Sequence, residues 1–172
     1  MGQPGDPLVI WDITAPSNAN RTQIHGFEFS LQHLFGDSGF GLQANWSIPS
    51  GGATWNPVVI GSQFALPGLS RSYNVVGFFE RWGFQTRVAY AHRGAFLASL
   101  NQIQQAQEPI YTAAYGQLDM SASYDIGKHL SVFFDALNLT SASQHQYGRY
   151  TEQFISASEG FARYQVGVRV AL

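Results

Sequence analysis

The segment Arg163-Tyr164-Gln165-Val166-Gly167-Val168-Arg169-Val170-Ala171-Leu172 decides the fold, because every second residue in it is apolar. Successive side chains of a β-strand point to opposite faces, so this period of two predicts a strand with one apolar face. The same period runs through Phe84–Tyr90 and Leu118–Tyr124. No stretch of comparable length has helical spacing, and the sequence therefore predicts an all-β protein.

The connections between the alternating segments indicate how the strands are arranged. We expect about eight strands, near residues 7–13, 21–35, 39–48, 70–80, 83–97, 111–125, 129–139 and 160–172. Short turns at residues 36–39, 81–83 and 125–128 alternate with long connections at residues 14–20, 49–69, 98–109 and 140–159. This strict alternation is typical of antiparallel transmembrane β-barrels, which have short periplasmic turns and long extracellular loops.

The composition also fits strands that separate lipid from water. Of the 172 residues, 15% are aromatic and only 12% are charged, and the charged share is about half that of a typical soluble domain. The formal net charge of −2 gives no indication of a nucleic-acid partner. The N-terminal segment MGQPGDPLVI lacks the features of a signal peptide. Because an outer-membrane protein must be exported, we expect a fragment, a mature form or a truncated reading frame.

Alternation alone does not distinguish a membrane barrel from a soluble one. Aromatic residues near the predicted strand ends resemble interfacial girdles and favour the membrane barrel; they are Tyr73, Phe79, Trp82, Phe84, Phe96, Tyr124 and Tyr164. In a membrane barrel the polar set faces a wet lumen. The charged residues that we expect on this lumen face are Glu28, Arg87, Asp119, Asp135, Arg163 and Arg169.

Several stretches resemble, in the same order, the C-terminal barrel of TonB-dependent outer-membrane receptors. They are Ala15–Asn18 with Ile24–Glu28, Leu66–Ser70 with Tyr73-Asn74, Phe79–Tyr90, Leu118–Tyr124, Phe134–Thr140 and Phe161–Leu172. The chain departs from the family in ending with Leu172, where the family usually has an aromatic residue. We also recognise neither the plug domain nor the TonB box of the family.

The resemblance implies a function in nutrient uptake at the bacterial outer membrane, with a siderophore or an oligosaccharide as cargo. The family barrel has about twenty-two strands, so residues 1–172 are expected to form a single barrel segment that does not transport cargo alone. The implied partners are outer-membrane lipid, the barrel-assembly machinery, the remaining receptor strands, the plug and the TonB complex. A small closed barrel of the same eight strands is the alternative architecture.

Candidate site residues lie in two long connections and at the C-terminus. Aromatic and amide side chains suit contacts with a sugar or a siderophore, and the candidates for ligand binding are Trp55, Asn56, Asn101 and Gln104. Packing against neighbouring loops is the competing role for these residues. The resemblance further implies an assembly signal in the last strand, formed by Gly167, Val170 and Leu172.

Other functional classes find less support in the sequence. Glu28, Ser30 and His25 lie close together, but strand alternation places His25 on the opposite face, so we predict no catalytic triad and no enzyme. Cysteine is absent and the histidines lack ligand spacing, so we expect no metal and no cofactor. Two alternatives remain: a free-standing outer-membrane barrel with a structural or adhesin-like role, and a soluble barrel that binds an apolar ligand.

Overall fold

The structure is a computed structural model that describes residues 21–59, 61, 63–103 and 106–171. For residues 101–103 and 106–107 it describes the backbone alone. The strand predicted near residues 7–13 lies outside the described residues. Within them, no helix is long and apolar enough to cross a membrane.

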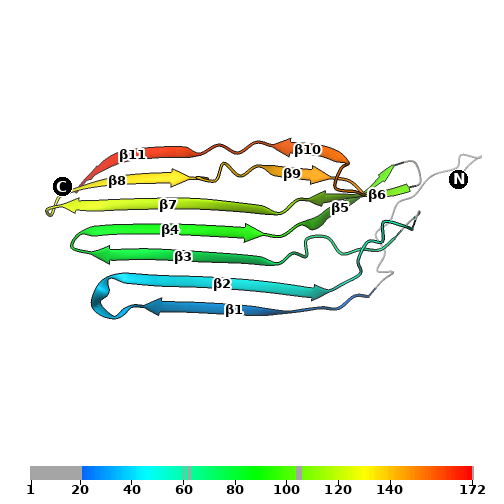
Figure 1. The fold of residues 1–172 in the computed structure, drawn as a ribbon, viewed down its shortest axis with the longest axis horizontal. Helices are drawn as coiled ribbons and strands as arrows, with labels where there is room; N and C mark the ends of the chain where they lie inside the picture. The colour runs from blue at the N-terminus through cyan, green and yellow to red at the C-terminus, as the bar shows by residue number, and fades with distance from the viewer. Residues whose placement is uncertain (1–20, 60, 62, 104–105, 172) are drawn as a thin grey trace, which may run out of the picture.

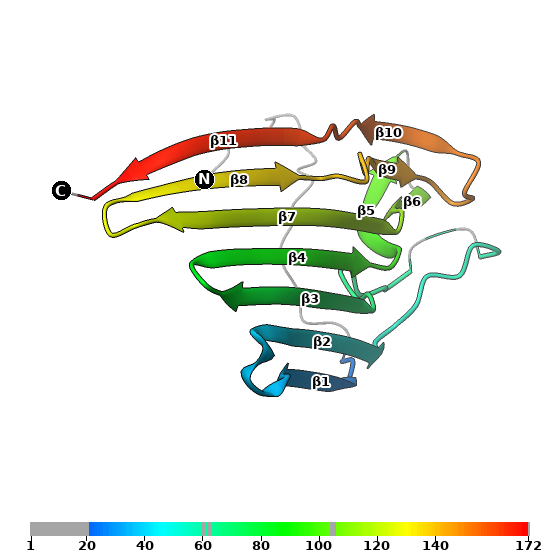
Figure 2. The ribbon, with the colours of Figure 1, turned by 60° about the vertical axis from the view of Figure 1, so that its left-hand side comes forward.

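Seven antiparallel strands form the main sheet, in the order β1-β2-β3-β4-β7-β8-β11 (Figure 1). Their bounds are β1 Ile24–Leu34, β2 Phe40–Gly51, β3 Ser72–Arg81, β4 Phe84–Arg93, β7 Tyr115–Ile126, β8 Leu130–Leu137 and β11 Arg163–Val170. These strands coincide with seven of the predicted segments and confirm the all-β antiparallel fold. Among the described residues the sheet is open, and β1 and β11 are its opposite edges (Figure 2).

The short turns all lie at one end of the main sheet, which we call the turn end (Figure 1, left). A short 3-10 turn at Gly36–Ser38 joins β1 to β2, and Trp82-Gly83 joins β3 to β4. Both residues of the second turn have positive φ, 54° and 77°, as a two-residue hairpin turn requires. The predicted alternation of short and long connections is therefore confirmed for the described strands.

A second, four-stranded sheet lies at the opposite end, which we call the loop end (Figures 1 and 2). Its order is β10-β9-β6-β5, and its strands are β5 Phe96–Ile103, β6 Ala106–Thr112, β9 Gln144–Tyr147 and β10 Phe154–Ser158. The long connections predicted at residues 98–109 and 140–159 contain these four strands in whole or in part, and the strands were not predicted from the sequence. Backbone groups pair in a ladder whatever the side chains are, so amide-rich segments extend the hairpins as strands.

The register of the main sheet separates an apolar face from a polar face. One continuous row of cross-strand partners, for example, runs Leu42, Gly77, Val88, Met120, Ala136 and Tyr164. The next row on the other face contains Gln43, Val76, Ala89 and Asp119. The alternation read from the sequence thus gives the correct side for both sets of residues.

The apolar face is uncovered, and the hydrophobic core is correspondingly small. Buried hydrophobic residues among those described are Trp55, Ala65, Val76, Leu97 and Ala136. In contrast, Phe27 is 69% exposed and Val166 is 80% exposed on the apolar face. A soluble domain buries such residues, so this face requires lipid or another apolar partner.

Two glycines on the polar face lie under aromatic rings from the neighbouring strand. Gly41 pairs with Phe78, and Gly167 pairs with Phe133. A Cβ atom at either glycine would overlap the phenylalanine ring. The ring covers backbone that the glycine leaves bare, which is a known way to stabilise glycine within a sheet.

We predict that Gly167→Val lowers the free energy of unfolding by about 1–3 kcal/mol, because the Phe133 ring must leave its position. Gly77→Val is the matched control, since nothing lies within 4 Å of a Cβ at Gly77 on the apolar face. The control is expected to change stability by at most about 1 kcal/mol. Urea unfolding in detergent micelles measures both. Equal effects would contradict the role given to the Phe133 ring.

Candidate functional site

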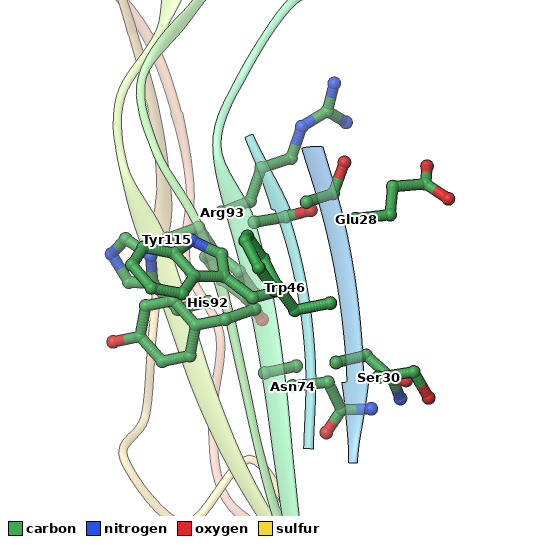
Figure 3. Close-up of a pocket in the computed structure, with 13 residues that line it drawn as sticks. Glu28, Ser30, Trp46, Asn74, His92, Arg93 and Tyr115 are labelled. Atoms are coloured by element: carbon green, nitrogen blue, oxygen red, sulfur yellow. The ribbon is translucent and has the colours of Figure 1, made fainter. Parts of the chain in front are cut away.

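A hollow of about 670 Å³ lies on the main sheet near the loop end (Figure 3). We define the loop-end hollow by the small and amide side chains that line it on the polar face: Ser30, Asn45, Ser47, Ser72, Asn74 and Ala91. Glu28, Arg93 and Tyr115 also line it, together with four residues whose side chains belong to the apolar face: Phe29, Trp46, Tyr73 and His92. Figure 3 shows Glu28, Ser30, Asn74 and Arg93 on one side of the sheet and Trp46 on the other.

The register explains why the sheet is hollow there. Two adjacent rows contribute: Glu28, Ser47, Ser72, Arg93 and Tyr115 in the first, and Ser30, Asn45, Asn74, Ala91 and Gln117 in the second. Short side chains dominate both rows, and long residues lie at both ends of the first row and at the Gln117 end of the second. The depression therefore follows from residue size at adjacent positions of the polar face.

The side chains of the hollow carry unused hydrogen-bonding capacity. The Oδ1 atom of Asn74 is buried and has no hydrogen-bond partner. Arg93, in contrast, is held at the rim, because its Nη2 donates to Gly68 O at 3.0 Å and its guanidinium lies 3.8 Å from the centre of the Phe96 ring. Its charge is thus directed toward the loops.

A chain of hydrogen bonds borders the hollow along β7. The Tyr115 hydroxyl donates to Gln117 Oε1, and Gln117 Nε2 donates to Asp119 Oδ1 at 2.7 Å. The same Asp119 oxygen accepts the backbone N–H of Asn138 at 2.8 Å. Asp119 therefore has a structural role at the junction of the two sheets.

Asn138 shapes the junction where β8 leaves the main sheet. It has a positive φ of 56° and its side chain is buried. The side-chain oxygen accepts the N–H of Ala142 at 2.8 Å, and Nδ2 donates to the carbonyl of Ala142 at 3.1 Å. This amide closes the turn that directs the chain from β8 into β9.

Three other charged residues of the polar face lie toward the turn end. Arg87, Asp135 and Arg169 line a second, more polar hollow of about 440 Å³. The register places all six charged residues predicted for the lumen on the same face of the sheet: Glu28, Arg87, Asp119, Asp135, Arg163 and Arg169. Their exposure to a lumen remains a prediction.

At the loop end, a small apolar cluster holds the long connection of residues 52–71 to the second sheet. Trp55, Ala65 and Leu97 form the cluster, and Tyr111 packs against it. Burial, and then the neighbouring Tyr147, raises the pKa of the Tyr111 hydroxyl above its usual value. The Tyr111 and Tyr147 rings stack with centroids 5.4 Å apart.

Arg149 joins three separate segments of the loop end. Its Nη2 and Nε donate to the two Glu108 oxygens at 2.9 and 3.3 Å, which makes a bidentate ion pair. Its Nη1 donates to the carbonyl of Pro57 at 2.6 Å. The guanidinium also lies 5.7 Å from the centre of the Trp55 ring. The hydrogen bonds to Glu108 raise the pKa of Arg149 above its usual value.

The structure gives structural contacts to two of the predicted ligand-binding residues. Trp55, a candidate for ligand binding with loop packing as its competing role, is only 7% exposed and belongs to the apolar cluster. Asn56 is exposed, and its Oδ1 accepts the N–H of Val58 at 3.0 Å. The side chain of Asn101 and all of Gln104 lie outside the described residues.

The predicted assembly signal lies on the edge strand β11. Gly167 faces Phe133 on the polar face, and Val170 is 63% exposed on the apolar face. Leu172 lies outside the described residues. The N–H of Ala171 donates to the carbonyl of His129 at 2.9 Å, which ties the end of the strand to β8.

The three residues weighed as a catalytic triad do not lie on one face of the sheet. Glu28 and Ser30 share the polar face, whereas His25 lies on the apolar face, as strand alternation predicts. No group of three histidine, aspartate or glutamate side chains within the described ranges is placed to hold a metal ion.

Sequence reasoning missed Asn74, Asn138 and Arg149 as residues of the site. In the sequence, Asn74 is recognisable only as an amide within an alternating strand. This is the one signal that could have identified it as a residue of the site. Arg149 and Pro57 are separated by 92 positions, so their contact has no local pattern in the sequence.

We predict that Arg149→Ala loosens the connection of residues 52–71, because the ion pair to Glu108 and the bond to Pro57 are both lost. Limited proteolysis of the folded chain should then cut within residues 52–71 roughly tenfold faster. Arg163→Ala is the matched control, because Arg163 is exposed and lies on β11. Cleavage at the unchanged rate in Arg149→Ala would contradict this role.

The family described as TonB dependent receptor-like, beta-barrel, matches residues 2–139. Curated proteins and solved structures give no match to the chain. The match covers most of the chain, including the hollow, and it agrees with the open antiparallel sheet. The chain therefore belongs to the β-barrel region of the TonB-dependent receptor family.

Proposed function

We propose that this chain forms part of the wall of a nutrient receptor in the bacterial outer membrane, with its loop end outside the cell. One observation carries the proposal: an uncovered apolar face extends across all strands of the main sheet, and a polar face lies behind it. A wall between lipid and a wet lumen needs this pair of faces. The six charged residues named above would then line the lumen.

Strand length and aromatic placement support the proposal. A strand tilted in a bilayer needs about 9–11 residues to cross it. β1 to β4 and β7 have 10 to 12 residues. On the apolar face, Phe40 and Phe79 lie near the turn end with ring centroids 4.6 Å apart, and Tyr73 and His92 lie near the loop end with centroids 4.9 Å apart. These pairs fit the two aromatic girdles of a barrel.

The cargo and partners follow from the family and are part of the proposal. The receptor would take up a siderophore or an oligosaccharide, with the plug and the TonB complex supplying the gate and the energy. The open edges of β1 and β11 would pair with the remaining receptor strands, because unpaired strand edges are untenable in lipid. We do not expect these residues alone to carry cargo, which an uptake assay in cells that make only this chain would test.

The two alternatives fit the described residues less well. A free-standing small barrel requires β1 and β11 to close the sheet, and the described strands leave both edges open. A soluble barrel requires its apolar residues to line an interior, whereas Val168 is 62% exposed and Phe29 is 56% exposed. The wall of a larger barrel satisfies both observations.

We predict that Val168→Arg disfavours membrane insertion by about 2–4 kcal/mol if position 168 lies near the bilayer midplane. Arg169→Ala is the matched control on the opposite face and is expected to cost much less. Partitioning of each variant between folded, bilayer-embedded protein and unfolded protein in urea measures the difference. The reverse order would show that the apolar face does not contact lipid.

We further propose that Gly167, Val170 and Leu172 present the last strand to the barrel-assembly machinery. An edge strand can add to an exposed sheet edge through main-chain hydrogen bonds, while its alternate side chains fill apolar positions. Val170 has this exposed, apolar placement at the end of β11. Gly167, on the other face, lets the Phe133 ring of the neighbouring strand lie against its backbone.

Deletion of residues 170–172 is expected to reduce the amount of folded protein in the outer membrane strongly. The control is an equal deletion of residues 58–60, within the long connection at the loop end. Heat-dependent gel migration of membrane fractions measures the folded protein. If both deletions assemble equally well, the terminal strand has no special role in assembly.

A further inference from the structure

We propose that the apolar face of the main sheet binds one lipid at a defined place, namely lipid A, the phosphorylated glycolipid anchor of lipopolysaccharide. The inference rests on the proposed function, because that function places the loop end at the outer leaflet, where lipopolysaccharide lies. It starts from a hollow of about 530 Å³ on the apolar face. We define this apolar-face hollow by the six apolar-face side chains that line it: Phe29, Leu31, Ala44, Trp46, Tyr73 and Val75.

Residue size in two neighbouring cross-strand rows produces the apolar-face hollow. Ala44 lies between its partners Leu31 and Val75 and is the smallest side chain of the three. The next row toward the loop end is aromatic and consists of Phe29, Trp46 and Tyr73. The hollow therefore has Ala44 as its floor, aliphatic side chains along its flanks and aromatic rings at its loop-end mouth.

A hydrocarbon chain suits this lining. Only Trp46 and Tyr73 carry a polar side-chain atom, and both residue types favour the membrane interface, where one end of the ring is apolar and the other is wet. An acyl chain that enters the hollow leaves other acyl chains, which are equally apolar, so apolar transfer alone favours no particular lipid. Selectivity must therefore come from the fit of the chain and from the headgroup.

Two basic side chains lie where the headgroup of a lipid in the hollow would be. His92 stacks on Tyr73 with ring centroids 4.9 Å apart, and Figure 3 shows it on the same side of the sheet as Trp46. Arg71 immediately precedes β3, and Gly94 N–H still donates to its carbonyl at 2.8 Å. Strand alternation therefore places Arg71 on the same face as Tyr73, one step nearer the loop end.

The charge of Arg71 is available to a phosphate group. Arg71 is exposed, and its guanidinium has no hydrogen bond or ion pair to another described residue. The two carboxylates of β1 to β4, Glu28 and Glu80, lie on the polar face. Neither of them can neutralise Arg71 or repel an anion on the apolar face. The charge at the mouth of the hollow is thus complementary to an anionic headgroup.

Lipid A matches both features of the site. It carries phosphate on a sugar headgroup above several acyl chains, so one chain can fill the hollow while a phosphate reaches Arg71. A guanidinium can hold phosphate through two parallel hydrogen bonds, and the imidazole N–H of His92 can donate another. An anionic phospholipid has the same kind of phosphate, but in an outer membrane phospholipids lie mainly in the opposite leaflet, at the turn end.

Binding is tested on the full chain folded in detergent micelles, by native mass spectrometry that counts the lipids retained. The probes are bisphosphorylated lipid A, its monophosphorylated form, phosphatidylglycerol as an anionic phospholipid and phosphatidylethanolamine as an uncharged one. We expect one bisphosphorylated lipid A to be retained and the monophosphorylated form to bind more weakly. Both phospholipids are expected to bind at least roughly tenfold more weakly than bisphosphorylated lipid A.

Arg71→Ala tests the headgroup contact. It should weaken binding of bisphosphorylated lipid A roughly fivefold, which is the contribution of one cation near an anionic lipid surface. Arg81→Ala is the matched control, because Arg81 is the exposed arginine at the turn end of the same strand. It should change the affinity less than about twofold.

Ala44→Phe tests the acyl-chain contact, because it fills the hollow and should abolish retention of lipid A. Val88→Phe is the matched control, since Val88 is 40% exposed on the same face but does not line the hollow. Strand content and heat-dependent gel migration show whether each variant is folded. A measurement on the parent chain needs no variant: in deuterated micelles, acyl protons of lipid A should give nuclear Overhauser effects to the Trp46 indole and none to Trp82 at the turn end.

The inference is overturned if either phospholipid binds as tightly as lipid A, or if Arg71→Ala and Arg81→Ala bind alike. Retention of lipid A by folded Ala44→Phe, or acyl contacts no stronger at Trp46 than at Trp82, would overturn it as well. The proposed wall fails through a different measurement, because it requires only that the chain inserts into a bilayer, including one that contains no lipid A.

Discussion

The structure depends on one constraint, which is that every backbone polar group inside a bilayer needs a partner within the protein. The main sheet satisfies this constraint through long, regular ladders of backbone hydrogen bonds. The ladder between β1 and β2, for example, is continuous from Ile24 to Leu34. Alternation along each strand places the apolar side chains on one face at no cost to the ladder. The small core and the uncovered apolar face fit the proposed wall, in which lipid would cover this face as a core does in a soluble domain.

The same constraint explains the division into two sheets. Near the loop end the strands no longer need to present an apolar face, and Asn138 or Gly94 can interrupt them. At the first break, the buried amide of Asn138 bonds Ala142. At the second, Gly94 N–H donates to the carbonyl of Arg71 at 2.8 Å. Beyond these breaks, side-chain contacts such as the ion pair of Arg149 with Glu108 hold the strands together, where the proposed wall would no longer be in contact with lipid.

The sequence predicts the main sheet well because its signal is local. Strict alternation predicts the strands, and the lengths of the connections predict that the short turns lie together at one end of an antiparallel sheet. The loop-end sheet was missed because amide-rich segments such as residues 98–109 have the composition of loops. The site was found only in part: Trp55 has a residue type suited to binding, but its burial depends on contacts with Leu97 that alternation does not encode. The contribution of Asn74 to the hollow depends on its cross-strand partners Asn45 and Ala91. These three residues become neighbours only through the register of three strands, which the sequence does not show.

The order of the strands also bears on how the chain folds. Each strand of the main sheet pairs with the one that precedes or follows it, except where β5-β6 and β9-β10 intervene. These exceptions are nested hairpins, because β5 pairs with β6 at the tip of the β4–β7 pair, and β9 pairs with β10 at the tip of the β8–β11 pair. The other ladders can therefore zip from a turn or hairpin already formed, so closing each adds little chain entropy, whereas β2–β3 and β6–β9 must each close a long connection. A wall built in this way can grow hairpin by hairpin from either edge, and the hairpin tips outside the bilayer remain free to form first.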